Sequence, residues 1–113
     1  MVDKSISLIM PAYNEEEAIE FTVRSVLEKL KEYCFDYEIF IFNDGSTDKT
    51  GEIAERLSAE DSKIKVFHNP KNMNLGYNFG RGISMVSKTF TGLWPCHGLI
   101  TSKSLDYILL ALY

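Results

Sequence analysis

Two short polar segments carry the residues best suited to chemistry. Pro11-Ala-Tyr-Asn-Glu15 follows one apolar run, and Asn43-Asp-Gly-Ser46 follows another. A carboxylate after a strand, such as that of Asp44, can accept hydrogen bonds from the N–H edge of a nucleobase or from a ribose hydroxyl. Tyr13 can lie along a base, and Glu15 can bind ribose. A structural alternative stays open, because Asp44 can stabilise a turn or cap a helix and the first segment can end a strand before an Asn cap.

Cations in the second half of the chain suggest a phosphate site. Lys71 and Arg81 can meet a diphosphate, although solvated surface cations would look the same in the sequence. Segment 76–82, Gly-Tyr-Asn-Phe-Gly-Arg-Gly, imitates a glycine-rich phosphate loop but does not follow the first strand. We therefore expect its glycines to permit close packing of a helix on a sheet.

Apolar periodicity predicts four strands that alternate with four helices. Strands are indicated by short β-branched or alternating runs, and helices by apolar residues three and four apart. Pro11 is expected to end the first strand and Asn14 to cap the first helix, while Thr47 or Asp48 caps the second. The predicted strands are 5–10, 37–42, 64–68 and 91–94, and the predicted helices are 15–31, one that begins at 47 or 48, 76–87 and one that begins at 101 or 102.

This alternation predicts the α/β class, as a Rossmann-like parallel sheet of about four strands with helices on both faces. Ligands of such sheets bind beyond the carboxyl ends of the strands. The segments that follow the strands, 11–15, 43–46, 68–74 and 95–98, are therefore the ones expected to form a site.

Composition narrows the function. A chain of 113 residues is one domain or a piece of a larger protein, and its pI of about 5.1 argues against a nucleic-acid module. Of the 16 acidic residues, Asp106 alone follows residue 62, so the second half is basic and free of carboxylate pairs. Cys34 and Cys96 are expected to be free thiols in a reducing compartment, which favours the cytoplasm. No apolar run reaches the ~20 residues of a membrane span.

The order of the motifs resembles the N-terminal half of family 2 glycosyltransferases, most closely the dolichyl-phosphate mannose synthase-like and bacterial sugar-transferase members. That family shows P-x-Y-N-E, then D/N-D-G-S-x-D-x-T, then N-x-G-x-G. Segment 11–15 matches the first motif and segment 43–50 the second. The third is matched in part by Asn72, Leu75, Gly76 and Gly82, with Asn74 where glycine is usual. A dinucleotide-binding oxidoreductase is disfavoured, since the first turn is not glycine-rich.

The resemblance implies a GT-A fold that binds a UDP- or GDP-linked sugar for glycosyl transfer, with a lipid phosphate as the acceptor of the full-length family. The implied nucleotide-sugar-binding residues are Pro11, Ala12, Tyr13, Glu15 and Asp44, and Lys71 is the candidate for the diphosphate. The implied location is the cytoplasm, including the cytoplasmic face of a membrane.

The same resemblance implies Mg²⁺ or Mn²⁺, held by an acidic motif after the fourth strand. Here that place is taken by Pro95-Cys-His-Gly98, with His97 where the key aspartate would stand. Imidazole suits Zn²⁺ or Ni²⁺ better than Mg²⁺, and Cys96 with His97 gives two ligands, too few for a metal site.

The chain also ends at Tyr113, before the acceptor half of the family. We therefore expect residues 1–113 to be a single truncated domain, incomplete or inactive by itself. The alternative is a non-catalytic remnant that self-associates through an open sheet edge.

Overall fold

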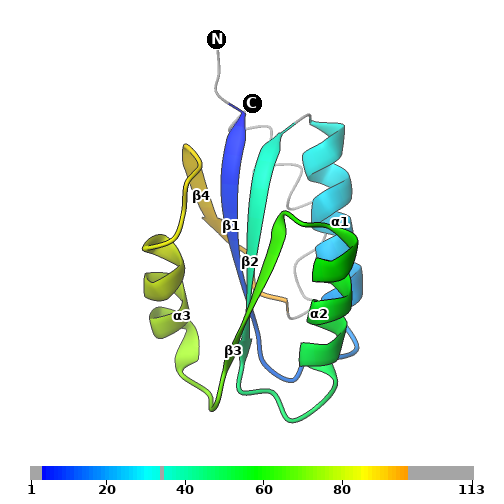
Figure 1. Cartoon of the computed structure of the whole chain (residues 1–113), viewed down its shortest axis with the longest axis vertical. Coiled ribbons are helices and arrows are strands. Elements are labelled where there is room, and N and C mark those ends of the chain that lie inside the picture. The colour runs from blue at the N-terminus through cyan, green and yellow to red at the C-terminus, as the bar shows by residue number, and fades with distance from the viewer. Residues whose placement is uncertain (1–3, 34, 97–113) are drawn as a thin grey trace.

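The computed structural model describes residues 4–33 and 35–96 of the chain (Figure 1). Within these ranges, the strands form one parallel sheet in the order β3-β2-β1-β4. Its strands are β1 (Ser5–Ala12), β2 (Asp36–Asp44), β3 (Ile64–Asn69) and β4 (Phe90–Leu93). The α/β class and the parallel sheet predicted from the sequence are confirmed.

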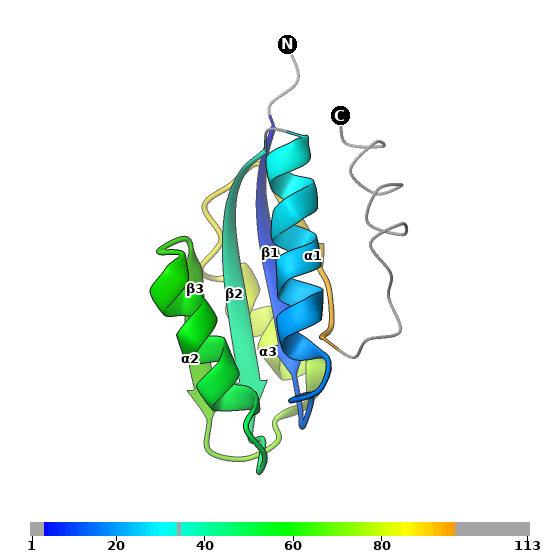
Figure 2. The ribbon, with the colours of Figure 1, turned by 90° about the vertical axis from the view of Figure 1, so that its right-hand side faces the viewer.

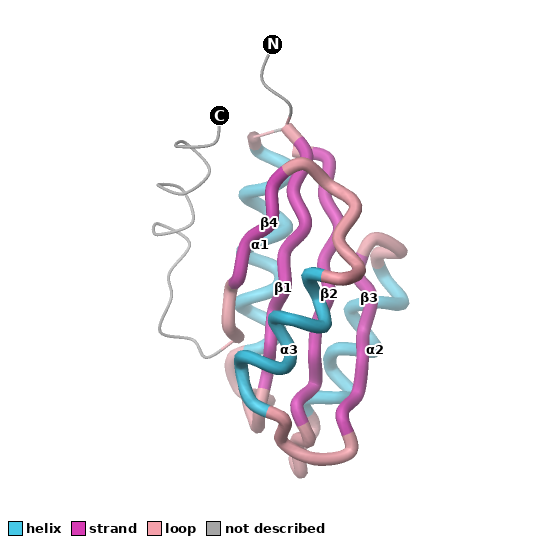
Figure 3. Tube along the Cα trace, turned by 90° about the vertical axis from the view of Figure 1, so that its left-hand side faces the viewer, coloured by secondary structure: helices cyan, strands magenta, loops and turns pink. Residues whose placement is uncertain are grey.

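Helices cover both faces of the sheet. They are α1 (Ile19–Glu32), α2 (Thr50–Glu60) and α3 (Asn74–Ile83). Figure 2 shows α1 and α2 side by side over one face, and Figure 3 shows α3 over the other. None of these three helices is both long and apolar enough to cross a membrane. The predicted helix after residue 101 and the predicted role of His97 lie outside the described residues.

Two apolar clusters, one on each face, hold the sheet. The larger one lies under α1 and α2 and contains buried residues of β1 and β2, together with Trp94. The smaller one lies under α3 and consists of Ile9, Phe40 and Phe42, with Phe67 packed against them. Because both faces are covered, the central strands are apolar on both sides and do not alternate with polar residues. This explains why β1 and β2 read as nearly continuous apolar runs.

The first strand does not end at Pro11, as expected from the sequence, but continues to Ala12. Pro11 is paired with Phe42 of β2, and its carbonyl oxygen accepts a hydrogen bond from the Cys96 N–H at 3.0 Å. Proline lacks one ladder donor but keeps its acceptor, so pairing near the end of a strand continues. As a result, Cys96 lies beside the first polar segment.

The predicted start of the first helix was also wrong. α1 begins at Ile19, four residues later than expected, and Asn14 does not cap it. Asn14 instead has a left-handed backbone, with φ of 49°. The third helix begins two residues earlier than predicted and ends at Ile83. For the second helix, the predicted cap at Thr47 or Asp48 was wrong, since the N-cap residue is Lys49, although Asp48 Oδ1 accepts the N–H of the first helical residue, Thr50, at 2.9 Å.

A carboxylate at the opposite end of the sheet fastens the segment before β4. Glu38 accepts hydrogen bonds from the Ser7 hydroxyl at 2.6 Å and from the Ser87 N–H at 2.7 Å. The Ser87 hydroxyl donates to the second oxygen of Glu38 at 2.9 Å. These bonds fix the entry of β4, and thereby the position of the residues that follow it.

Candidate functional site

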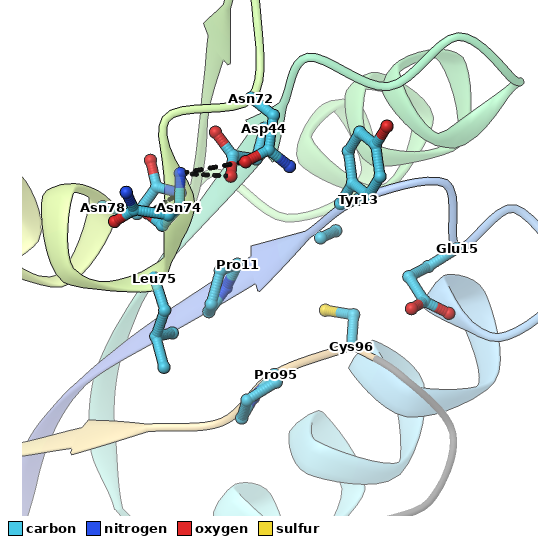
Figure 4. Close-up of a pocket in the computed structure, with 11 residues that line it drawn as sticks. Pro11, Tyr13, Glu15, Asp44, Asn72, Asn74, Leu75, Asn78, Pro95 and Cys96 are labelled. Carbon is cyan, nitrogen blue, oxygen red and sulfur yellow. Dashed lines mark hydrogen bonds between the residues drawn. The ribbon is translucent and has the colours of Figure 1, made fainter.

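A pocket of about 420 Å³ lies at the carboxyl ends of the strands (Figure 4). This volume is within the range of small-molecule sites. The polar loops after β1 and β2, the start of α3 and the segment after β4 all contribute to it. Its lining residues are Pro11, Ala12, Tyr13, Glu15, Asp44, Asn72, Asn74, Leu75, Asn78, Pro95 and Cys96.

The structure therefore brings together five of the six site residues predicted from the sequence. Lys71 is the exception: it is exposed, and it is not among the residues that line the pocket. Its backbone instead packs against Gly45. A Cβ atom at Gly45 would lie 2.4 Å from the carbonyl carbon of Lys71 and 2.5 Å from the nitrogen of Asn72. Gly45 also has φ of 75°, so glycine is required there for both reasons.

Hydrogen bonds join the loop after β1 to the loop after β2, and we call this set the loop clasp. Each bond pairs a backbone N–H of one loop with a side-chain oxygen of the other. The bonds are Asn14 N–H to Ser46 Oγ (3.0 Å), Thr47 N–H to Asn14 Oδ1 (2.8 Å), Glu15 N–H to Thr50 Oγ1 (2.8 Å) and Glu16 N–H to Asp48 Oδ2 (3.2 Å). The serine, aspartate and threonine of the second motif thus hold the first motif in place.

Asp44 is buried at the back of the pocket, with 4% of its surface exposed. Its Oδ1 accepts hydrogen bonds from Asn69 Nδ2 at 2.9 Å and from the Met73 N–H at 2.8 Å. Its Oδ2 accepts from the Asn74 N–H at 3.1 Å. Two of these donors are backbone groups at the N-terminus of α3, so Asp44 caps α3 and not α2.

This environment keeps Asp44 ionised at neutral pH. Burial alone would raise the pKa of its carboxyl, but the hydrogen bonds that it accepts, led by those from the Met73 N–H and Asn69, together outweigh this effect. The pKa therefore lies below its ordinary value of 3.8. A carboxylate is consequently presented to the pocket, with its orientation fixed by three donors.

Asn69 links Asp44 to a second layer of side chains. Its Nδ2 also donates to Asn78 Oδ1 at 2.7 Å, and its Oδ1 accepts a hydrogen bond from Arg81 Nη1 at 3.2 Å. The Arg81 guanidinium lies 5.7 Å from the ring centroid of Phe42. Arg81 is exposed, which agrees with the solvated cation considered from the sequence, and it also contacts Asn69 and an aromatic face.

Tyr13, Glu15 and Cys96 form the front of the pocket (Figure 4). Tyr13 is 48% exposed, as a stacking platform requires. Cys96 is a buried, free thiol. Burial, helped by the negative charge of Glu15, raises the pKa of this thiol to about 12. Cys96 is therefore a neutral, weakly polar wall of the pocket.

The described residues do not fit a divalent metal. Among residues 4–33 and 35–96, no group of three or more His, Cys, Asp or Glu side chains could hold an ion. A protonated thiol is also a poor partner for Mg²⁺ or Mn²⁺, which prefer oxygen ligands.

The segments 68–74 and 95–98 predicted from the sequence contain three further lining residues, Asn72, Asn74 and Pro95, although none was named as a ligand contact. Leu75 and Asn78 also line the pocket and lie outside the predicted segments. A signal was present at Asn74, which stands where the family motif has glycine. Its φ is 72°, a left-handed value that glycine adopts freely and asparagine tolerates better than most residues.

Two groups of known proteins are similar to this chain. Glycosyltransferase AglD of Haloferax volcanii is 40% identical over 63% of this chain, and dolichyl-phosphate beta-glucosyltransferase ALG5A of Trichomonas vaginalis is 38% identical over 63%. The chain spans 12% and 24% of their respective lengths. Among solved structures, S. aureus TarS 1–349 in complex with UDP-GlcNAc has a TM-score of 0.72 at 23% identity, over 94% of this chain and 30% of that one.

A further structure with the same fold is the mannosyltransferase PcManGT of Pyrobaculum calidifontis, in complex with GDP-Man and Mn²⁺. Its TM-score is 0.63 at 17% identity, over 81% of this chain and 29% of that one. These likenesses confirm the GT-A type of fold. The family model "Glycosyl transferase family 2" matches residues 7–105. The chain therefore belongs to glycosyl transferase family 2.

Proposed function

We propose that this chain is the nucleotide-sugar-binding part of a glycosyltransferase, and that its pocket holds the nucleoside of the donor. One observation carries the proposal: a carboxylate oriented by three donors stands opposite an exposed aromatic ring in the same pocket. An ionised acceptor and a stacking surface are the two groups that a nucleobase needs.

Each predicted residue has a role in this proposal. Asp44 accepts a hydrogen bond from a base N–H, and Tyr13 lies along the base. Glu15 binds the ribose, and the backbone of Pro11 and Ala12 forms the adjoining wall. These five residues come from the ends of β1 and β2, which the loop clasp holds in register. The nucleotide therefore meets a preformed surface.

Lys71 contacts the diphosphate in this proposal. It is exposed and immediately precedes Asn72, which lines the pocket. A flexible lysine at this place can reach a phosphate without lining the base site. The name of PcManGT's complex includes Mn²⁺, but the described residues of this chain contain no group of three or more His, Cys, Asp or Glu side chains that could hold it.

The acceptor and the location belong to the same proposal. We assign a lipid phosphate as the acceptor and the cytoplasmic face of a membrane as the place of transfer. The support comes from relatives whose names include dolichyl-phosphate and undecaprenyl-phosphate. A second candidate function is self-association of a non-catalytic chain. It is favoured by β4, a strand of four residues whose ladder within the described ranges is with β1.

Calorimetric titration of the chain with UDP, GDP and their sugars, with and without Mn²⁺, tests the proposal. We expect saturable heat with at least one of them. Tyr13→Ala should weaken that binding, while Tyr77→Ala is the matched control, since Tyr77 is similarly exposed at 47% and does not line the pocket. No heat with any ligand, or equal losses in both variants, would contradict the assigned pocket. A dimer detected by light scattering, together with no heat of nucleotide binding, would favour the second candidate function, self-association of a non-catalytic chain.

A further inference from the structure

We propose that the exposed face of α3 docks the chain on an anionic lipid surface. The inference rests on the proposed function, which includes transfer at a membrane, and it adds the surface of the chain that meets the lipid. Its basis is an uncharged, partly apolar helix face that is bordered by cations. Figure 3 views this side of the molecule, where α3 lies outermost over the sheet.

The outward face of α3 differs from the exposed faces of the other two helices. The buried side of α3 contains Asn78 and Gly82, whereas Tyr77 and Ile83 protrude from the opposite side, 47% and 44% exposed. Gly80 lies between these two, and a Cβ atom there would meet nothing within 4 Å. The exposed positions of α1 and α2 are instead mostly charged. Only α3, among these three helices, therefore presents solvent with a largely uncharged face that contains an aromatic and an aliphatic side chain.

Cations border this face. Arg81 belongs to α3, and its guanidinium lies 5.3 Å from the ring centroid of Phe67. Lys65 precedes Phe67 by two residues in β3, so its side chain leaves the same face of the sheet as that ring. Lys65 and Arg81 are exposed, and neither forms an ion pair within residues 4–33 and 35–96. Lys71, which precedes the helix, is exposed as well.

Acidic groups on this side of the sheet are engaged elsewhere. The sequence has no carboxylate side chain in the segment 62–105. In β2, Asp36, Glu38 and Asp44 alternate with the phenylalanines of the smaller cluster and thus face the side of α3. Asp36 pairs with Lys88 at 3.0 Å, Glu38 fastens the segment before β4, and Asp44 is buried under the start of α3. The exposed charges beside α3 are therefore positive and complementary to anionic lipid headgroups.

A lipid surface can use each of these groups. Tyrosine rings lie at the level of the headgroups, aliphatic side chains enter the boundary of the acyl chains, and Lys and Arg contact lipid phosphates. The first turn of α3 also lines the nucleotide pocket, through Asn74 and Leu75. Docking through α3 therefore holds the pocket next to the lipid, where a lipid-phosphate acceptor is presented.

Co-sedimentation of the whole chain with vesicles, without nucleotide, tests this docking face. We expect binding to phosphatidylcholine vesicles that contain about a third phosphatidylglycerol, with binding about tenfold weaker to pure phosphatidylcholine and lost as salt is added. Tyr77→Ser and Ile83→Ser should each weaken binding several-fold. Lys65→Gln should weaken it about fivefold, the contribution of one cation near an anionic surface.

Matched control variants lie on the opposite face of the sheet. Phe21→Ser removes an apolar side chain from α1, where Phe21 is 71% exposed (Figure 2). Lys31→Gln removes a cation from an exposed position of the same helix. Both should leave vesicle binding unchanged. Circular dichroism checks that every variant is folded.

The outcomes separate this inference from the proposed function. No binding to anionic vesicles, binding that is independent of lipid charge, or equal losses in the α1 controls would overturn the docking face, while nucleotide binding is measured separately by calorimetry. A dimer that Tyr77→Ser dissociates, without vesicle binding, would assign the face to a second copy and also overturn the inference. Vesicle binding with the expected losses but no nucleotide binding would support the docking face and contradict the proposed pocket.

Discussion

Asp44→Asn is the substitution that tests the structure of the site most strictly. The carboxylate of Asp44 receives three hydrogen bonds, two of them from the N-terminus of α3. Asparagine has nearly the same shape but one amide acceptor. Its NH₂ group would replace Oδ2 and face the Asn74 N–H, so that two donors meet in a buried place. The variant should therefore lose a charge-assisted hydrogen bond and leave a buried donor without a partner.

The expected loss of stability is about 1.5–3 kcal/mol, the range for hydrogen bonds to charged groups. Because Asp44 is 4% exposed, solvent screening reduces this value little. The assay is urea unfolding followed by circular dichroism at pH 7. Glu28→Gln is the control, since it removes the same charge from an exposed position on α1, and it should change stability by less than ~0.5 kcal/mol. An Asp44→Asn variant as stable as this control would refute the capping role.

The pH dependence of the same variant gives an independent check. The pKa of Asp44 is lowered in the folded chain from an ordinary value of 3.8. Its stabilising contribution is therefore present above pH ~4 and is lost as the pH falls through the folded pKa. The stability difference between the unmodified chain and Asp44→Asn should accordingly narrow below about pH 3.8. A difference that stays constant from pH 7 to pH 3 would contradict the ionised, hydrogen-bonded carboxylate.

Three further predictions follow from single contacts. Thr50→Val should speed hydrogen exchange of the Glu15 amide, because it removes the hydroxyl that this N–H donates to; unchanged exchange would contradict the loop clasp. Gly45→Ala should destabilise the chain, whereas Gly80→Ala should stabilise it by about 0.5–1 kcal/mol, since a Cβ at Gly80 meets nothing within 4 Å and alanine favours a helix; urea unfolding compares them. Cys96 should resist alkylation in the folded chain at pH 8 and react after unfolding, as measured by peptide mass mapping.

The arrangement of the fold could be predicted because apolar spacing reports which face of an element is buried. Val23, Val26 and Leu30 recur at helical spacing, and all are buried in α1. The continuous apolar runs of β1 and β2 are typical of strands covered on both faces. The boundaries of the elements were less accurate, since they depend on contacts between segments far apart in the chain.

Asn14 illustrates such a contact. In the sequence it precedes three glutamates and looks like a helix cap. In the structure its side chain accepts the N–H of Thr47, 33 residues away, and its backbone turns left-handed. No local pattern contains this partner. A proline inside a strand failed to end it for a related reason, because the carbonyl of Pro11 finds a donor in Cys96.

The second motif, segment 43–50, located the site but did not define the role of each of its residues. It drew attention to Asp44, and the structure places Asp44 in a pocket with Tyr13 and Glu15. The motif does not distinguish residues that face a ligand from those that hold the loops. Asp48 and Thr50 match the motif equally well, yet both serve the loop clasp. That distinction required the three-dimensional arrangement.

The most direct test of nucleotide binding in this pocket is an NMR titration of the ¹⁵N-labelled chain with UDP. We expect chemical-shift changes to concentrate at the amides of the pocket, Tyr13, Glu15 and Asn72 to Asn74. The amides at the opposite end of the sheet, such as those of Lys63 and Ser87, should keep their chemical shifts. Shifts spread evenly over the chain, shifts gathered at that opposite end, or no shifts at millimolar UDP would contradict nucleotide binding in this pocket.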